Sequence, residues 1–402
     1  MIVFWVMGWM VLLALAVPVC VLVAQVLLAC MSKQRSAPSP SGSSPLQRPR
    51  VVVLVPAHNE AAGLGATLDA LMPQLAASDR ILVVADNCDD ATAAVARAHG
   101  AEVTERHDTL QRGKGYALDH GVRQLASDPP DVVVIVDADC LVTAGALTRL
   151  AAQAAAAKRP VQALYLMKAP PGAGLKTRIA EFAWLIRNEV RPLGWHRLNW
   201  PCQLMGTGMA FPWPVISTAS LATGHIVEDM QLGLELAERG VPPMFCPDAL
   251  VTSLFPHKDE ALAAQRTRWE HGHLSMLLTR GPLQLLRAAQ RADIPLAAMA
   301  LDLCVPPLVS LLLLLCTACL VGLMAFVAGA PAWFLMGGVL LTGGTLAAIA
   351  LAWQRRGREV MAPSDWLSLP GYVLGKLPIY FRFLAGRRQR AWVRTERDHD
   401  GR

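Results

Sequence analysis

Two aspartates separated by one small residue, Asp137-Ala138-Asp139, directly follow an apolar run of β-branched residues, Val132–Val136. Such a run predicts a buried strand, so both carboxylates are expected at its carboxyl end. Carboxylate oxygens are ligands that Mg²⁺ and Mn²⁺ prefer. The spacing therefore predicts a divalent metal site that carries a phosphorylated substrate, although an Asp-x-Asp triplet also occurs in ordinary turns.

The elements that must position these aspartates are visible in the preceding sequence. Two more apolar runs, Val51–Val55 and Ile81–Val84, alternate with Ala-rich helical stretches at Ala61–Leu75 and Ala91–His99. Strands and helices alternating at this spacing predict an α/β fold with a parallel sheet and crossover helices. Ligands of such sheets collect beyond the carboxyl ends of the strands.

Polar clusters follow all three predicted strands, which places them at one edge of the sheet. The first two are Pro56-Ala57-His58-Asn59-Glu60 and Asp86-Asn87-Cys88-Asp89-Asp90. Asn59 and Asp90 also stand where helix N-caps belong, and a cap needs no ligand. The N-cap explanation leaves unexplained why Asp86 and Asp137 stand so close to strand ends.

Apolar segments near the two ends of the chain account for a composition that is 53% hydrophobic and 17% charged. Ile2–Met31 carries no charge, and Leu303–Ala328 and Ala332–Trp353 are similar, so three transmembrane helices are predicted. The segment Leu27-Leu28-Ala29-Cys30 resembles a lipoprotein cleavage box. However, no Lys or Arg precedes this run, which is about twice as long as a signal core, so we expect a retained anchor.

Basic residues flank the predicted spans on one side only. They are Lys33, Arg35, Arg48 and Arg50 after the first span, Arg280, Arg287 and Arg291 before the second, and Arg355, Arg356 and Arg358 after the third. By the positive-inside rule, the N-terminus lies outside, and the central domain and C-terminus face the cytoplasm at the inner membrane. Anionic lipid then explains the net charge of +6 without a nucleic-acid partner. Five of nine cysteines lie in the membrane runs, so no disulfide framework is predicted.

The chain is expected to divide into six segments. They are a transmembrane helix at 1–32, a Ser/Pro-rich linker at 33–49, an α/β domain at 50–280, an interfacial helix at 281–302, two transmembrane helices at 303–353, and an amphipathic helix with a basic tail at 354–402. For Trp366–Arg388 within the last segment, a fourth span remains the alternative to an interfacial helix.

Four further motifs carry residues suited to sugar and phosphate chemistry. They are the basic Gly-rich stretch Arg112–Leu118, the small-residue stretch Met205–Phe211, the acidic His225–Asp229, and Gln265-Arg266-Thr267-Arg268-Trp269. Arg suits bidentate diphosphate contacts and an indole face suits a sugar ring. Simpler explanations are a basic surface turn, a strand-edge turn, first-turn acids of a helix, and a basic interfacial helix.

In this order, the motifs resemble those of membrane-integrated family 2 glycosyltransferases related to cellulose, hyaluronan and poly-N-acetylglucosamine synthases. The resemblance covers Val51 to about Trp269. It implies a GT-A fold, which is a Rossmann-like, mostly parallel sheet with flanking helices, in a cytosolic domain with about three transmembrane helices and interfacial helices. It also implies an enzyme that transfers a hexose or N-acetylhexosamine from a UDP-sugar with Mg²⁺ or Mn²⁺.

The resemblance also implies site residues. Asp137 and Asp139 correspond to the metal motif, with Asp139 the closer ligand, and Asp86 corresponds to the residue that binds uracil. The residues expected to hold substrate or nucleotide are Pro56, Asn59, Glu60, Asp86, Lys114, Asp137, Gly206, Thr207, Gln265, Arg266, Arg268 and Trp269. Two departures are Ala85-Asp86-Asn87-Cys88 in place of Asp-Asp-Gly-Ser and Val227 in place of Thr.

Catalysis is implied for Asp229 as the base, with Glu228 beside it, in an inverting displacement. The implied acceptor is a membrane lipid or a growing glycan, in cell-surface polysaccharide synthesis with other export proteins as partners. Two alternatives remain open. One is a single transfer to a lipid such as ceramide or polyprenyl phosphate, and the other is a non-catalytic nucleotide-sugar binding partner of a synthase.

Overall fold

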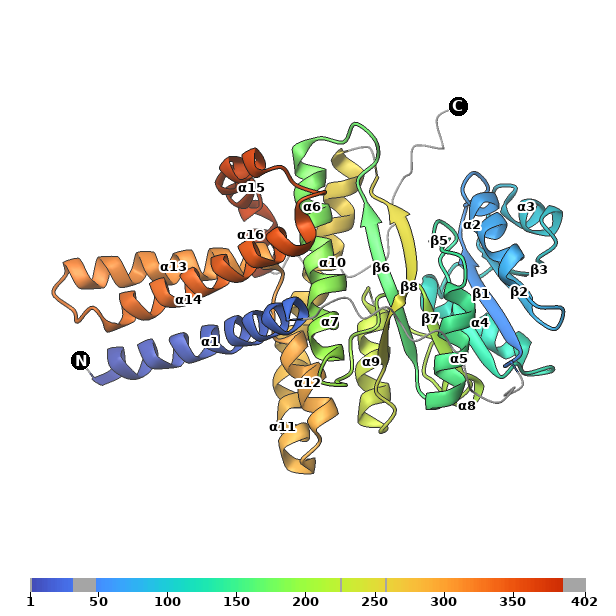
Figure 1. The fold of residues 1–402 in the computed structure, drawn as a ribbon, viewed down its shortest axis with the longest axis horizontal. Coiled ribbons are helices and arrows are strands. Elements are labelled where there is room, and N and C mark those ends of the chain that lie inside the picture. Colours follow the sequence, from blue (N-terminus) through green and yellow to red (C-terminus); the bar gives the residue numbers. More distant parts are fainter. Residues whose placement is uncertain (1, 32–47, 225, 257–258, 386–402) are drawn as a thin grey trace. The chain divides into compact units, whose positions relative to one another are not determined.

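The computed structural model describes residues 2–31, 48–224, 226–256 and 259–385. They form two compact units (Figure 1). The sheet unit contains residues 48–171 and 200–266, and the helix unit contains residues 2–31, 172–199 and 267–385, with the same gaps. Almost all of the predicted linker at 33–49, His225 and the end of the predicted basic tail lie outside the described residues.

The sheet unit is built on one sheet with eight described strands in the order β3-β2-β1-β4-β7-β6-β8-β5. The strands are β1 Val51–Ala57, β2 Arg80–Asp86, β3 Glu102–Arg106, β4 Val132–Ile135, β5 Leu141–Val142, β6 Val161–Lys168, β7 Met209–Pro212 and β8 Met244–Leu254. Strands β1 to β4 run parallel, as do β6 and β8, whereas β7 and β5 run antiparallel to their neighbours. The predicted α/β fold is therefore confirmed, as a mixed sheet with flanking helices.

Continuous apolar runs form the centre of this sheet because both of its faces are covered. Val51–Val55 of β1 are at most 1% exposed, and β4 is buried throughout. The flanking helices are α2 Leu64–Leu71, α3 Thr92–Ala98, α4 Lys114–Leu125, α5 Ala146–Ala157, α8 Trp213–Ile216 and α9 Glu228–Glu238. Helices α4 and α9 share one hydrophobic core with Leu54 and Ile135 of the sheet.

The strand directions bring distant segments to one edge of the sheet. The carboxyl ends of β1, β2 and β4 meet there because these strands are parallel. Strand β7 runs antiparallel to β4, with Met209 opposite Ile135, so its amino end reaches the same edge. The residues before β7, Gly206–Gly208, therefore lie beside Asp137, which follows β4.

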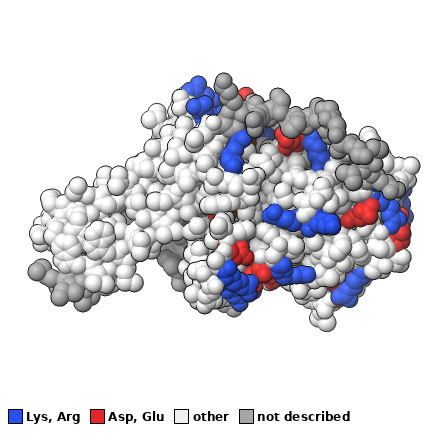
Figure 2. Space-filling view, turned by 60° about the horizontal axis from the view of Figure 1, so that its bottom comes forward, with Lys and Arg blue, Asp and Glu red and all other residues white. Residues whose placement is uncertain are grey.

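The helix unit contains three helices long and apolar enough to cross a membrane. The first apolar stretch, Trp5–Cys30, lies within α1 Ile2–Cys30. The second is the whole of α13, Leu308–Val327. The third, Trp333–Gly357, begins with α14 Trp333–Ala352. Helix α14 packs against both of the others, and Trp333 stacks on Trp9 with ring centroids 4.8 Å apart. Small residues such as Gly322 and Gly337 allow this close approach. On the face visible in Figure 2, these three helices show no charged side chain.

Further helices of this unit are short. They are α6 Leu175–Leu185, α7 Arg191–His196, α11 Gly281–Arg291, α12 Ile294–Leu303, α15 Leu369–Gly375 and α16 Leu377–Leu384. The expected interfacial helix at 281–302 is two helices because Ala292 has a φ of 50° and Asp293 caps α12 through the Leu296 amide. The expected amphipathic helix from Trp366 is likewise divided into short pieces, with Pro378 at the start of α16.

A buried polar cluster joins three helices of this unit. The Arg191 guanidinium of α7 donates to the Asp302 carboxylate of α12 at 2.8 Å and to the Gln25 side-chain oxygen of α1 at 3.0 Å. Gln25 in turn donates to Asp302 at 2.7 Å. Since Gln25 is 0% and Arg191 5% exposed, the three side chains satisfy one another away from water.

Candidate active site

Two carboxylates meet just after β4. Asp137, Asp139 and Cys140 place one potential ligand atom each within 4.8 Å of the others. The Cys140 side chain is fully buried, and this burial raises the pKa of its thiol well above the usual value. A neutral thiol is a poor ligand for hard cations, whereas two carboxylates suit Mg²⁺ or Mn²⁺. The donors here that suit a divalent metal are therefore Asp137 and Asp139, and their role as metal ligands stays a prediction.

Two buried threonines hold the loop that carries these aspartates. The Thr67 hydroxyl of α2 donates to the Ala138 carbonyl at 2.8 Å. The Asp137 amide donates to the Thr207 hydroxyl at 3.0 Å. Thr67 is 1% and Thr207 0% exposed, so both hydroxyls act away from water. The spacing of the two carboxylates is thus set by α2 on one side and by the segment before β7 on the other.

Lys114 is the basic residue at this edge. It is the first residue of α4, and its ammonium donates to an Asp137 carboxylate oxygen and to the Gly206 carbonyl, the latter at 2.8 Å. Desolvation lowers the pKa of Lys114, but the negative charges of Asp137, Glu228 and Asp229 outweigh it and raise that pKa. The ammonium therefore stays charged among three carboxyl groups, which is no ordinary basic surface turn.

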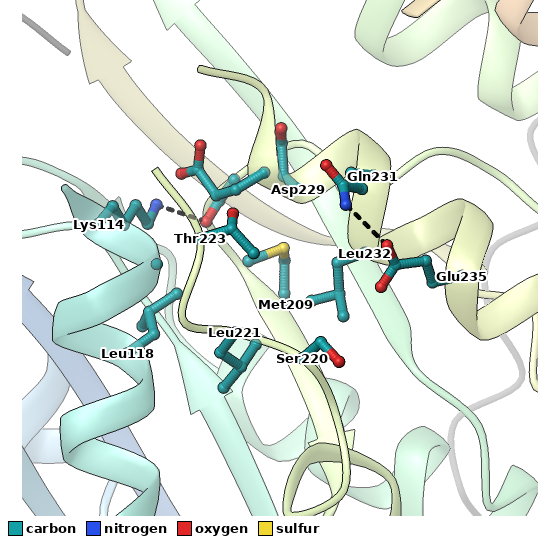
Figure 3. A pocket seen from close by; sticks show the side chains of 13 residues that line it. Lys114, Leu118, Met209, Ser220, Leu221, Thr223, Asp229, Gln231, Leu232 and Glu235 are labelled. Atoms are coloured by element: carbon teal, nitrogen blue, oxygen red, sulfur yellow. Dashed lines mark hydrogen bonds between the residues drawn. The ribbon is translucent and has the colours of Figure 1, made fainter. Parts of the chain in front are cut away.

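Glu228 and Asp229 lie in the first turn of α9 and line a pocket with Lys114 (Figure 3). The pocket encloses about 400 Å³, part of it open to solvent. Helices α4 and α9 contribute its two sides, and Leu118, Met209 and Leu232 supply apolar surface. Acids in a first turn also complement the helix dipole, but these two line a pocket with Lys114, which is itself bonded to Asp137.

The buried position of Glu228 in α9 changes the pKa of its carboxyl group. Burial first, and then the neighbouring charge of Asp229, raise the pKa of Glu228 from 4.5 to about 7, although Lys114 opposes this. Two carboxyls this close resist carrying two charges at once. The two acids therefore titrate as a pair, and burial beside Asp229 favours the protonated form of Glu228 more than water does.

Gly206 and Gly208 shape the turn that reaches the pocket. Gly206 has a φ of +90°, and a Cβ placed there would lie 3.5 Å from the Asp229 carboxylate. Gly208 has a φ of +64°, and a Cβ there would lie 2.7 Å from the Ala163 side chain. Both positions favour glycine, and the turn opens directly onto β7. The turn at Gly206 and Gly208 is therefore both a turn at the edge of β7 and a small-residue loop beside the pocket.

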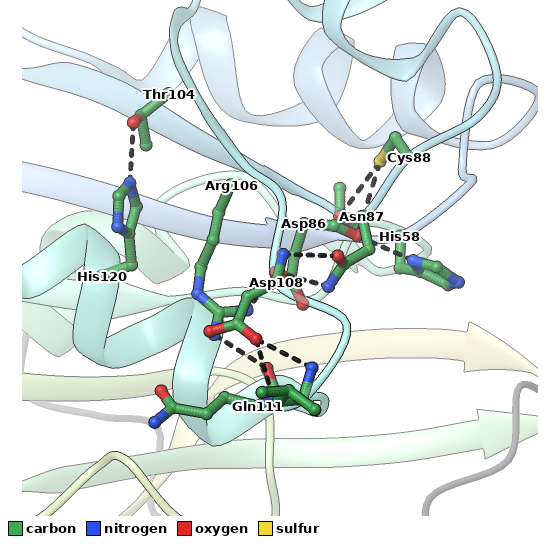
Figure 4. A network of polar contacts seen from close by, with 11 residues as sticks. His58, Asp86, Asn87, Cys88, Thr104, Arg106, Asp108, Gln111 and His120 are labelled. Atoms are coloured by element: carbon green, nitrogen blue, oxygen red, sulfur yellow. Dashed lines mark hydrogen bonds and ion pairs between the residues drawn. The ribbon is translucent and has the colours of Figure 1, made fainter.

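Asp86, at the end of β2, belongs to a polar network (Figure 4). The Arg106 guanidinium donates to its carboxylate at 2.6 Å and to that of Asp108 at 3.2 Å. Asn87 has a φ of 51°, in the left-handed region that Asn tolerates better than most residues, so it fits the position of glycine in the expected loop. The Asp108 amide donates to the Asn87 side-chain oxygen at 2.8 Å.

The first loop lies beside this network. The His58 ring bonds the Asp86 carbonyl at 2.7 Å, and the Asn59 side chain accepts from the Asp89 amide at 2.7 Å. The Glu60 amide donates to the Thr92 hydroxyl at 2.8 Å. Asp90 accepts from the amide of Thr92, the first residue of α3, at 2.9 Å, but the N-cap residue of α3 is Ala91, so Asp90 stands one residue before the cap position. Pro56, within β1, is half-buried.

The last motif lies on α10, Asp259–Thr279. Gln265 and Arg266 belong to the sheet unit, where the Arg266 guanidinium lies 6.0 Å from the Phe255 ring centroid. Arg268 and Trp269 belong to the helix unit, where Trp269 packs on Trp184 with ring centroids 4.7 Å apart. The donor-binding role of these four residues stays a prediction.

Several residues that support the site have no sequence motif. Gln162 of β6 is fully buried and donates to the Thr207 carbonyl at 3.0 Å, while its oxygen accepts from the Met205 amide at 2.8 Å. Thr67 and Arg106 act similarly on the loops they hold. In the sequence, a polar residue inside an apolar strand, as in Val161-Gln162-Ala163, is the local pattern that indicates such a supporting role.

The fold is similar to that of a solved glycosyltransferase. The mannosyltransferase PcManGT from Pyrobaculum calidifontis, in complex with GDP-Man and Mn²⁺, aligns over 93% of this chain and 100% of its own, at 19% identity and a TM-score of 0.54. Glucosyl-3-phosphoglycerate synthase from Mycobacterium tuberculosis covers 56% of this chain and 79% of its own, at 24% identity and a TM-score of 0.40. The first of these comparisons shows a shared GT-A fold.

Sequence comparison points the same way. An uncharacterized glycosyltransferase of Mycobacterium tuberculosis is 40% identical over 103 residues, which are 26% of this chain and 43% of the relative. The chain thus spans less than half the length of the curated relatives it matches. A family model described as "Glycosyltransferase like family 2" matches residues 49–272. Because that match spans more than half of the chain, the chain belongs to glycosyltransferase family 2.

Proposed function

We propose that this enzyme is an inverting, metal-dependent transferase that moves a hexose or N-acetylhexosamine from a UDP-sugar to a membrane-associated acceptor. The observation that carries this proposal is the meeting of Lys114, Asp137, Glu228 and Asp229 around the carboxyl ends of the strands and the pocket. Asp137 also belongs, with Asp139, to the pair that fits a divalent metal. Binding an anionic diphosphate requires cations, and removing the proton of an acceptor hydroxyl requires a base such as a carboxylate.

The base in this proposal is Asp229. It lines the pocket from the first turn of α9, and its carboxylate lies close to Gly206. A carboxylate within hydrogen-bond reach of an acceptor hydroxyl removes its proton as the oxygen attacks the anomeric carbon. One direct displacement of this kind inverts the anomeric centre. Glu228, whose pKa is raised by burial and by Asp229, lies beside it in the same turn of α9.

The leaving diphosphate requires positive charge. Asp137 and Asp139 would hold a Mg²⁺ or Mn²⁺ ion, which when bound offsets the charge that develops on the diphosphate oxygens. Lys114 supplies an ammonium, and the N-terminus of α4 adds the partial charge of its amides. Asp86 would bind the base of the nucleotide, with Asn59 and Glu60 in the adjoining loop. Solved GT-A enzymes titled with GDP-Man or UDP-Glc and Mn²⁺ support this chemistry by analogy.

The membrane helices support an acceptor in or on the bilayer. We infer that the sheet unit and C-terminus face the cytoplasm, since Arg280, Arg287, Arg355 and Arg356 flank the candidate spans on that side. The biological role is then synthesis of a cell-surface polysaccharide, with export proteins as partners. A second candidate is one transfer to a lipid, favoured because three candidate spans in the described residues are few for a polymer channel.

The test is sugar transfer by membranes that contain the protein, with a panel of UDP-sugars and GDP-mannose, in Mn²⁺, Mg²⁺ or EDTA. Metal-dependent release of UDP with one donor supports the proposal and names that donor. The size of the labelled product separates a retained polymer from a lipid carrying one sugar. Release of GDP would correct the nucleotide, and full activity in EDTA would overturn the metal requirement.

A further inference from the structure

The Asp137 carboxylate bonds an ammonium and also belongs to the pair that fits a divalent metal. The Lys114 ammonium donates to an Asp137 carboxylate oxygen and to the Gly206 carbonyl at 2.8 Å. The same Asp137 carboxylate lies in the group, with Asp139, that fits a divalent metal. A metal that takes up Asp137 therefore meets a positive charge already in hydrogen-bond contact with that side chain.

The position of Lys114 is costly unless anions hold it. As the first residue of α4, its cation stands at the positive end of a 12-residue helix, where acids are favoured. Its attraction to Asp137, Glu228 and Asp229 offsets that cost. Two like charges a few Å apart repel, and a half-buried site screens this repulsion less than water does. Lys114 must consequently weaken metal binding as long as it stays on Asp137.

A second anion changes this balance. A nucleoside diphosphate brings oxygens that accept hydrogen bonds from an ammonium. A lysine side chain has a flexible four-carbon stem, which lets its ammonium follow those oxygens. We infer that Lys114 is the internal counter-cation of Asp137 in the nucleotide-free enzyme, and that it passes to the diphosphate when the metal and nucleotide bind together. Lys114 is thus a positioning residue that makes metal affinity depend on nucleotide. This inference rests on the proposed function of the site.

Thermodynamic coupling gives the expected effect. If Lys114 competes with the metal, nucleotide raises metal affinity and metal raises nucleotide affinity by the same factor. Couplings between two ligands commonly fall between about 5-fold and 150-fold. Removing the ammonium should tighten binding of the metal alone by about tenfold and reduce this coupling. An ordinary diphosphate-binding lysine would weaken nucleotide binding without tightening the metal.

The experiment measures Mn²⁺ binding to the detergent-solubilised full chain by electron paramagnetic resonance of free Mn²⁺, alone and with UDP or GDP. Lys114→Gln is expected to bind Mn²⁺ alone about tenfold more tightly than the wild type and to gain less from the nucleotide. Lys114→Arg, which keeps the charge, should remain weak. Arg123→Gln, on the same helix and paired on the surface with Asp119, should match the wild type. Thermal unfolding checks that each variant is folded.

Two results separate the possible failures. If Asp139→Asn abolishes Mn²⁺ binding while folded Lys114→Gln binds Mn²⁺ alone no more tightly than the wild type, the counter-cation role is wrong and the metal site stands. If neither the wild type nor any variant binds Mn²⁺, even with UDP or GDP, the metal-dependent function is itself wrong.

Discussion

The Arg106 guanidinium at the end of β3 donates to the Asp86 carboxylate at the end of β2, at 2.6 Å. Both side chains are about nine-tenths buried, at 10% and 9% exposed. The pair links two neighbouring strand ends where a nucleotide base is proposed to bind. Its value therefore lies both in holding the loops and in aiming the Asp86 carboxylate.

Replacing Arg106 with Met should lower stability and raise the KM for the donor, with a smaller effect on kcat. The stability loss is expected at about 3 kcal/mol, because the change leaves a mostly buried carboxylate without its partner. Thermal unfolding and donor titrations measure both effects. Arg123→Met breaks a surface pair in the same unit and should cost below about 0.5 kcal/mol. Equal losses in the two variants would contradict a special role for Arg106.

Glu228→Gln should change how stability depends on pH. The pKa of Glu228 is about 7 in the folded protein and 4.5 ordinarily, so the folded state holds an extra proton between these values. The free energy of unfolding contributed by this group therefore falls as the pH rises through that window. Relative to the wild type, the Tm of the variant should rise between about pH 5 and pH 8, measured in EDTA. A Tm difference that does not vary with pH would show that Glu228 titrates normally.

Gly208→Ala should disrupt the turn before β7. A Cβ there meets Ala163 at 2.7 Å and Val251 at 2.9 Å, in addition to the φ of +64°. We expect a loss of about 2–4 kcal/mol from backbone strain and overpacking together. Gly240→Ala shares a similar φ of +79° but has open space around its Cβ, so it isolates the backbone part at about 1 kcal/mol. Thermal unfolding of both variants, with transfer activity, measures the difference, and equal losses would remove the packing argument.

Arg191→Met should destabilise the helix unit because Asp302 and Gln25 lose their shared donor. The expected cost is about 3 kcal/mol, as for a buried pair that loses one member. Replacing Asp302 with Leu as well should recover part of the stability, since no unpaired charge then remains. Arg178→Met, whose side chain is 40% exposed in its pair with Asp365, should cost about 1 kcal/mol or less. A double variant no more stable than Arg191→Met would contradict this explanation.

Local pattern predicts the first half of the sheet well and the second half poorly. Val51–Val55 and Val132–Val136 are continuous apolar runs; the first forms most of β1, and the second contains all of β4. The antiparallel placement of β7 depends instead on pairing with β4 and β6, which are distant in the chain. No local periodicity encodes such a pairing. Likewise, α11 and α12 are separate because of one left-handed residue, Ala292, which the apolar pattern does not reveal.

The candidate site shows the same division between local spacing and tertiary contact. Spacing alone places Asp137 and Asp139 together, and Glu228 and Asp229 in one helical turn. The contact between Lys114 and Asp137 spans 23 residues and depends on where α4 begins. The loop anchors Thr67 and Gln162 are ordinary polar residues in sequence and become informative only once they are seen buried and bonded. Family resemblance supplied the role of Asp229, which geometry by itself does not.

The most direct test compares transfer and donor binding in the wild type and Asp229→Asn. If Asp229 is the base, kcat should fall by about 10²- to 10⁴-fold while the donor KM changes little. Glu235→Gln, which alters another pocket acid bound to Gln231 at 2.7 Å, should keep activity within about threefold. That pattern would support base catalysis at α9. Unchanged kcat in folded Asp229→Asn would contradict it and remove the central claim about this site.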